Sequence, residues 1–166
     1  MSLLDIGSGI GSIIFELFEA GIKEAQYIDI SKPYTAIFRE EIEKRSLSEK
    51  VDVKTGDFTD NCPSVKSADI VTLDKVICCY PDFEQLVSSS IQKCKKYYAY
   101  VIPIDTWWVK LFHYSAGKIG KILGNQFETF IHPTGEIEKM VINHNFKKIY
   151  RKQRREWLTV VFEKSG

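Results

Sequence analysis

The stretch LLDIGSGIGS, residues 3–12, decides the fold. A short apolar run ends in an acid, three glycines follow at alternate positions, and residues 13–18 continue with helical spacing. This order predicts a strand over 3–6, a tight turn, and a helix over about 11–20. Glycine permits a sharp turn and the close approach of a ligand, and the free N–H groups at the helix start can meet a polar ligand. We therefore expect a ligand site here, although an ordinary glycine turn would use the same residues.

The glycine spacing differs from the dinucleotide-binding fingerprint G-x-G-x-x-G, because Ser12 stands where that fingerprint has its third glycine. The pattern Asp5-x-Gly7-x-Gly9-x-Gly11 resembles motif I of the class I S-adenosylmethionine-dependent methyltransferases. This resemblance implies S-adenosyl-L-methionine as cofactor. It also implies a doubly wound α/β fold with a seven-stranded, mostly parallel sheet and an antiparallel final strand.

Composition is typical of one folded domain that spans residues 1–166. The chain is 44% hydrophobic and 27% charged, and its formal net charge of +1 predicts no acidic partner. The four cysteines form no C-x-x-C pair, so we expect reduced thiols in a cytoplasmic protein and no metal site. No apolar run is long enough to predict a membrane span.

The rest of the chain alternates strand and helix patterns. Strands are predicted over 25–30, 51–55, 68–73 and 97–103, helices over about 33–45, 83–95 and 135–143, and a closing hairpin over 148–153 and 157–163. Only two residues precede the first strand. We therefore expect the domain to lack the N-terminal helices that the resembled family usually carries.

An aromatic-rich insertion, residues 104–131, interrupts this alternation. One interpretation is a core-packing helix. The other is a lid that lines an apolar acceptor pocket, because insertions after the fifth strand commonly shape substrate choice in the resembled family. The predicted substrate pocket comprises Tyr80, Trp107, Trp108 and Tyr114.

An acid, Asp29, ends the second predicted strand, eighteen residues after Gly11. A carboxylate there can accept hydrogen bonds from two ribose hydroxyls of either NAD or S-adenosylmethionine. The alternative is an acid at a helix start, since Ser31 can cap the next helix and Pro33 suits its first turn.

A second acid and an aromatic residue, Asp57 and Phe58, follow the third strand. The resemblance implies that the acid accepts from the adenine amino group and that the ring packs on the base, although Gly-Asp also suits a simple turn. The cofactor-binding residues predicted in this way are Asp5, Gly7, Ser8, Gly9, Gly11, Asp29, Ile30, Asp57, Phe58 and Leu73.

Methyl transfer requires mainly alignment of the acceptor, and a general base helps when the acceptor is a hydroxyl. The candidate catalytic residues are Asp74, at the end of the fourth strand, and His113, in the insertion. Asp74 could instead pair with Lys75. We interpret His132 as a packing residue, since it precedes a helix.

The resulting hypothesis is S-adenosylmethionine-dependent methyl transfer to a small-molecule acceptor. A non-catalytic S-adenosylmethionine-binding module and an NAD(P)-dependent oxidoreductase of related fold remain alternatives. A nucleic-acid partner is not expected, because the basic stretch 147–155 is interpreted as the solvated charges of an edge strand.

Overall fold

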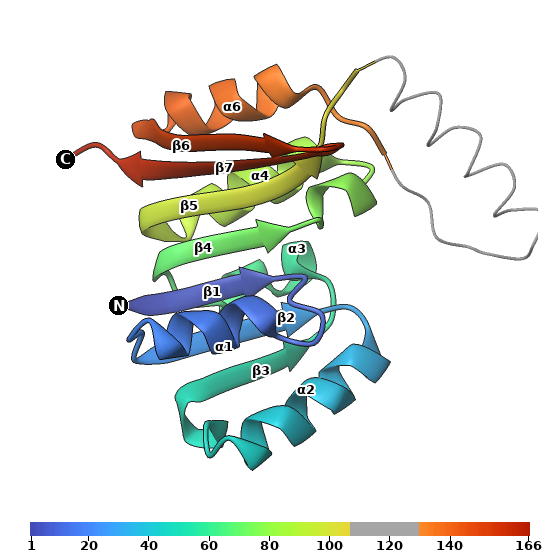
Figure 1. Cartoon of the computed structure of the whole chain (residues 1–166), viewed down its shortest axis with the longest axis vertical. Coiled ribbons are helices and arrows are strands. Elements are labelled where there is room, and N and C mark those ends of the chain that lie inside the picture. The colour runs from blue at the N-terminus through green and yellow to red at the C-terminus, as the bar shows by residue number, and fades with distance from the viewer. Residues whose placement is uncertain (107–129) are drawn as a thin grey trace, which may run out of the picture.

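The computed structural model describes residues 1–106 and 130–166 (Figure 1). Its sheet contains strands β1 (Ser2–Ile6), β2 (Glu24–Asp29), β3 (Val51–Thr55), β4 (Ala68–Asp74), β5 (Cys94–Pro103), β6 (Phe146–Arg154) and β7 (Trp157–Lys164). They lie in the order β3-β2-β1-β4-β5-β7-β6. Strands β1 to β5 pair in parallel, whereas β7 pairs antiparallel with both β5 and β6. The predicted fold class, a seven-stranded and mostly parallel sheet with an antiparallel final strand, is therefore confirmed.

Helices cover both faces of this sheet (Figure 1). Helices α1 (Ser12–Glu19) and α2 (Lys32–Lys44) pack on one face around Tyr27 and Phe38. Helices α4 (Phe83–Gln92) and α6 (Thr134–Asn143) pack on the other face, against the larger core cluster that includes Tyr98. The core thus lies on both sides of a buried sheet, as expected for parallel strands.

The strand order changes direction between β1 and β4. Chain connections run from β1 outward to β2 and β3, and then return to β4 on the other side of β1. The loops after β1 and β4 therefore diverge at the carboxyl end of the sheet. Such a switch point is where open α/β sheets bind ligands.

Strand β5 begins earlier than predicted. Cys94 is buried and pairs with Ala68, so the strand starts there instead of at Tyr97. Lys95 and Lys96 are exposed charges that suggest a helix end, yet they lie in the strand. The sequence also did not predict α3 (Phe58–Asn61) or the 3₁₀ turns Ser48–Lys50, Cys62–Ser64 and Ile77–Cys79.

Residues 107–129, which form most of the predicted insertion, lie outside the described residues. The predicted site residues Trp107, Trp108, His113 and Tyr114 are among them. Within the part of the chain that the structure describes, no helix is both long enough and apolar enough to cross a membrane.

Candidate functional site

A cavity of about 620 Å³ opens at the carboxyl ends of β1 to β4. Its wall is built from the loops that follow these strands, together with one residue from beyond the undescribed segment. The lining residues are Ile6, Gly7, Gly9, Ile28, Asp29, Ile30, Ser31, Tyr34, Gly56, Asp57, Phe58, Asp74, Lys75, Val76, Cys79, Tyr80, Pro81 and Phe130. The cavity therefore lies at the switch point of the sheet.

The three glycines after β1 have different surroundings. All three adopt positive φ angles, +65° at Gly7, +56° at Gly9 and +83° at Gly11, which side chains rarely adopt. A Cβ added at Gly11 would lie 2.2 Å from a ring carbon of Phe38, and one at Gly7 would lie 2.1 Å from Val76. A Cβ at Gly9 would meet no atom within 4 Å. Gly9 therefore leaves the loop open toward a ligand, whereas Gly7 and Gly11 allow close packing.

Two side chains of β2 hold this glycine loop. The N–H of Gly9 donates to Oδ2 of Asp29 at 2.8 Å, and the hydroxyl of Tyr27 donates to the Gly9 carbonyl at 2.9 Å. Tyr27 is itself fixed by stacking on Phe38, with ring centroids 4.1 Å apart. Residues two apart on a strand face the same side, so one face of β2 positions the loop.

Asp29 also organises the start of α2. Its Oδ1 accepts from the N–H of Ser31 at 2.7 Å, and the Ser31 hydroxyl caps the helix by accepting from the N–H of Tyr34 at 3.3 Å. Asp29 therefore does lie at the start of a helix, as the alternative interpretation of this residue predicted. This position does not exclude ligand binding, because Asp29 lines the cavity and each of its oxygens retains a free lone pair.

Asp5 lies beneath the glycine loop and does not line the cavity. Its carboxylate accepts from the hydroxyl of Ser8, and its Oδ1 accepts from the hydroxyl of Thr72 at 2.5 Å. Burial raises the pKa of Asp5 to about 6, although the Ser8 and Thr72 hydrogen bonds oppose that shift. Asp5 thus supports the loop from below.

Three further predicted cofactor contacts are also absent from the cavity lining, namely Ser8, Gly11 and Leu73. Ser8 joins the loop to Asp5, Gly11 packs on Phe38, and Leu73 is fully buried in the sheet. The remaining predicted residues line the cavity: Gly7, Gly9, Asp29, Ile30, Asp57 and Phe58.

Asp57 begins α3 and joins two loops. Its Oδ1 accepts from the N–H and the hydroxyl of Thr59, each at 2.7 Å, and from the hydroxyl of Tyr80 at 2.5 Å. Burial opposes ionisation, but these hydrogen bonds outweigh it and hold the pKa of Asp57 below its usual value. Phe58 beside it is 2% exposed and reaches the core.

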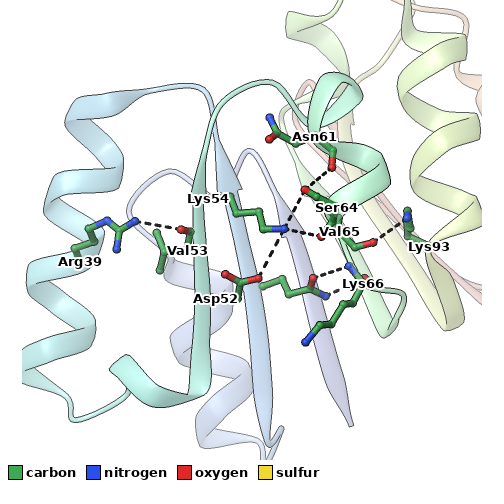
Figure 2. A network of polar contacts seen from close by, with 10 residues as sticks. Arg39, Asp52, Val53, Lys54, Asn61, Ser64, Val65, Lys66 and Lys93 are labelled. Carbon is green, nitrogen blue, oxygen red and sulfur yellow. Dashed lines mark hydrogen bonds and ion pairs between the residues drawn. The ribbon is translucent and has the colours of Figure 1, made fainter.

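Lysine side chains fasten the segment that follows Asp57 to the sheet, as Figure 2 shows. The ammonium group of Lys54 donates to the carbonyl and hydroxyl of Ser64 at 2.6 and 3.1 Å, and that of Lys93 donates to the Val65 carbonyl at 2.8 Å. The Ser64 hydroxyl in turn donates to the Asn61 carbonyl at 2.9 Å. These bonds fix the C-terminal part of the segment that follows Asp57.

The loop after β4 supplies the remaining polar wall. Asp74 lines the cavity, and the ion pairs found among the described residues do not include one between Asp74 and Lys75. The Lys75 ammonium instead lies 5.0 Å from the ring centre of Trp157. Cys78 and Cys79 are free thiols with their sulfurs 4.0 Å apart. Among residues 1–106 and 130–166, no three metal-ligating side chains gather.

His132 lies behind this loop. Its Nε2 is 2.8 Å from the Tyr80 carbonyl, and because a carbonyl only accepts, Nε2 carries the proton. Its ring packs on Phe83 with centroids 4.5 Å apart, and burial lowers the pKa of the imidazole. The N–H of Phe130 donates to the Cys78 carbonyl at 2.7 Å. His132 therefore packs and does not line the cavity.

Sequence reasoning missed two aromatic residues of the lining, Tyr34 and Phe130. Tyr34 follows the helix cap Ser31 by three residues, which places it in the first turn of α2, beside the cavity. That spacing was a usable signal. Phe130 lies within the predicted insertion, residues 104–131, but not among the four predicted pocket residues, and a tertiary hydrogen bond to Cys78 holds it at the cavity.

A family profile and solved structures both relate this chain to methyltransferases. The profile of the family described as "Methyltransferase domain" matches residues 4–97. No curated protein matches the chain in sequence.

Solved structures share the fold at low sequence identity. Magnesium protoporphyrin IX methyltransferase from Synechocystis, with bound S-adenosylhomocysteine, has a TM-score of 0.77 at 16% identity, and the match covers 98% of this chain and 74% of that one. A family 2 O-methyltransferase from Planctomyces limnophilus, in complex with apigenin, has a TM-score of 0.74 at 14% identity, and the match covers 99% of this chain and 50% of that one. A Pyrococcus horikoshii protein whose proposed activity is RNA methylation has a TM-score of 0.66 at 16% identity, and the match covers 98% of this chain and 74% of that one. The acceptors named for these proteins differ, so the shared fold does not indicate one.

Proposed function

The chain belongs to the methyltransferase domain family, and from this premise we propose that it transfers a methyl group from S-adenosyl-L-methionine to a small-molecule acceptor. The observation that carries the proposal is the cavity at the switch point, which Gly9, Asp29 and Asp57 all line. Asp29 and Asp57 offer acceptors for the ribose and the adenine of a methyl donor with an adenosine moiety.

The residues present fit this cofactor. Gly9 leaves open space at the loop, and Asp29 offers carboxylate oxygens for the ribose hydroxyls. Asp57 is held ionised and can accept from the adenine amino group, whereas Phe58 is almost fully buried in the core and offers little surface to a base. Ile30 is 71% exposed at the same edge, where its side chain can cover one side of the adenosine.

When bound, S-adenosylmethionine supplies a methyl group on a positively charged sulfur. The chain's own contribution is alignment, which in well-oriented reactions is worth about 7–11 kcal/mol. Asp74 lies at the end of β4 on the cavity wall, where it can take a proton from a hydroxyl acceptor. General-base help of this kind contributes about 10²–10⁴-fold. His113 remains a second candidate base from the sequence.

The acceptor side combines Asp74 with the loop Lys75–Pro81 and Phe130. Apolar and aromatic lining with few polar groups is typical of small-molecule sites. We include Trp107, Trp108 and Tyr114 in the proposed acceptor pocket on the sequence alone. Tyr80, predicted for the same pocket, lines the cavity.

The test is transfer of an isotopically labelled methyl group from S-adenosylmethionine to a panel of small hydroxyl, amine and thiol acceptors, with an RNA pool in parallel. Turnover on a small molecule, and not on RNA, is the expected result. Cofactor binding with no turnover on any acceptor would favour the non-catalytic module. Turnover on RNA that falls in the double variant Arg154→Ala/Arg155→Ala would favour a nucleic-acid acceptor instead.

A further inference from the structure

Tyr80 joins the two sides of the cavity. It follows the 3₁₀ turn after β4, and its hydroxyl donates to Oδ1 of Asp57, which follows β3. The contact spans 23 residues of sequence, so local chain geometry does not impose it. Tyr80 is thus placed to control how the Asp57 carboxylate is presented.

The hydrogen bonds of Asp57 are unevenly divided between its two oxygens. The Thr59 N–H, the Thr59 hydroxyl and the Tyr80 hydroxyl all end on Oδ1, and none of these three bonds uses Oδ2. A carboxylate oxygen offers about two acceptor positions, so Oδ1 has no capacity left for a ligand. These three bonds limit rotation of the carboxylate, and Oδ2, which takes none of them, is the oxygen left for a ligand in the cavity that Asp57 lines.

The backbone that carries Tyr80 is itself held. The protonated Nε2 of His132 donates to the Tyr80 carbonyl at 2.8 Å, and the Phe130 N–H donates to the Cys78 carbonyl at 2.7 Å. The N–H of Tyr80 completes the turn by donating to the Ile77 carbonyl at 3.2 Å. Tyr80 therefore reaches Asp57 from a braced loop, and its hydroxyl has one defined position.

We infer that Tyr80 is a positioning residue for cofactor recognition: it holds Asp57 so that Oδ2 accepts from the 6-amino group of the adenine, and it thereby determines selectivity for a 6-aminopurine. This inference rests on the proposed function and refines it. Tyr80 then belongs to the cofactor side of the cavity more than to the acceptor pocket. Phenylalanine at this position preserves the ring and removes only the hydrogen bond.

Calorimetric titration with two ligands tests the inference. One ligand is S-adenosylhomocysteine, and the other is its analogue with hydrogen in place of the 6-amino group. We expect Tyr80→Phe to weaken binding of S-adenosylhomocysteine about tenfold, the scale of one hydrogen bond to a charged group. Binding of the deaminated analogue should be the same in wild type and variant, because that ligand has no amino group for Asp57 to accept from.

Two companion variants complete the design. Thr59→Val removes a second donor to the same Oδ1 and should show the same selective loss, which keeps the test valid if Tyr80→Phe does not fold. Tyr150→Phe alters an exposed tyrosine of β6 and should change neither affinity.

The possible outcomes distinguish failure of the inference about Tyr80 from failure of the proposed function. Equal losses for both ligands would show that Tyr80 acts on the fold in general, and unchanged affinities would show that it does not position Asp57; either result overturns the inference while the proposed function stands. Failure of the wild-type protein to bind S-adenosylhomocysteine would overturn the proposed function and the inference together.

Discussion

The N–H of Gly9 lies 2.8 Å from Oδ2 of Asp29, so the last residue of β2 directly holds the loop after β1. Tyr27, two residues earlier on β2, holds the carbonyl of the same glycine. The glycine loop and the tip of the neighbouring strand therefore form one unit. Substitutions in either part should affect the same ligand.

Asp29→Ala should lower the affinity for S-adenosylhomocysteine by at least about tenfold, because the ribose hydroxyls lose a charged acceptor worth about 1.5–3 kcal/mol. The measurement is calorimetric titration. Asp69→Ala is the matched control, since Asp69 accepts from the N–H of Ser2 at 2.8 Å near the opposite end of the sheet. An Asp29→Ala protein with the affinity of wild type would remove Asp29 from the site.

Gly9→Ala and Gly11→Ala should separate binding from stability. Both place alanine at a positive φ, which costs about 1–2 kcal/mol. The Gly11 methyl also overlaps Phe38, and such overpacking costs about 1–3 kcal/mol more. Denaturant unfolding should therefore show the larger loss for Gly11→Ala.

Titration with S-adenosylhomocysteine should show the complementary result. The methyl of Gly9→Ala enters the space that a ligand occupies and should reduce affinity about tenfold, by steric conflict of about 1–3 kcal/mol. Normal affinity in a folded Gly9→Ala protein would mean that the ligand does not approach this glycine.

Asp5 should make stability depend on pH. Its pKa is about 6 in the folded protein against 3.8 in an unfolded chain, so the folded state binds more protons between these values. The contribution of Asp5 to the free energy of unfolding should therefore be fully present below about pH 4 and should be lost as the pH rises through 6, by an amount on the order of 3 kcal/mol.

The check is chemical unfolding of wild type and Asp5→Asn from pH 4 to pH 7. Asparagine can accept from Thr72 and donate to Ser8 without a titrating proton. The difference in unfolding free energy between the two proteins should thus shift in favour of Asp5→Asn as the pH rises. A difference that stays constant across this range would contradict the raised pKa.

Lys54→Met should weaken cofactor binding from a distance. It removes the two hydrogen bonds to Ser64 that fasten the segment after Asp57, as in Figure 2. Titration should show an affinity loss of a few-fold, since one net hydrogen bond is worth about 0.5–1.5 kcal/mol. Lys44→Met is the control, because Lys44 pairs with Glu41 on the surface of α2. If Lys54→Met and Lys44→Met bind the cofactor with equal affinity, the hydrogen bonds of Lys54 do not influence Asp57.

The strand–turn–helix pattern at residues 3–18 and the alternation that follows were sufficient to predict the strands and the closing hairpin, and the family resemblance implied the mostly parallel sheet with its antiparallel final strand. Hydrophobic periodicity reflects which residues are buried, and burial determines the position of most helices and strands in this fold. It failed at Cys94, where exposed lysines follow the first buried residue of β5. The pairing of Cys94 with Ala68 extends the strand to this point, although the exposed lysines suggest the end of a helix.

The site was predictable to the level of the strand tips, because acids that end parallel strands must gather at one edge. The pattern could not separate Gly9 from Gly11, because the position of Phe38 in the fold places Gly11 against the core, while Gly9 faces the cavity. It also could not show that Asp5 lies under the loop or that Tyr80 reaches Asp57, because both depend on contacts between distant segments.

The most direct test of the central claim is a calorimetric titration of the wild-type protein with S-adenosylhomocysteine and, separately, with NADH. The account predicts saturable binding of one S-adenosylhomocysteine per chain and no heat of binding for NADH. Tight binding of NADH with no response to S-adenosylhomocysteine would contradict it.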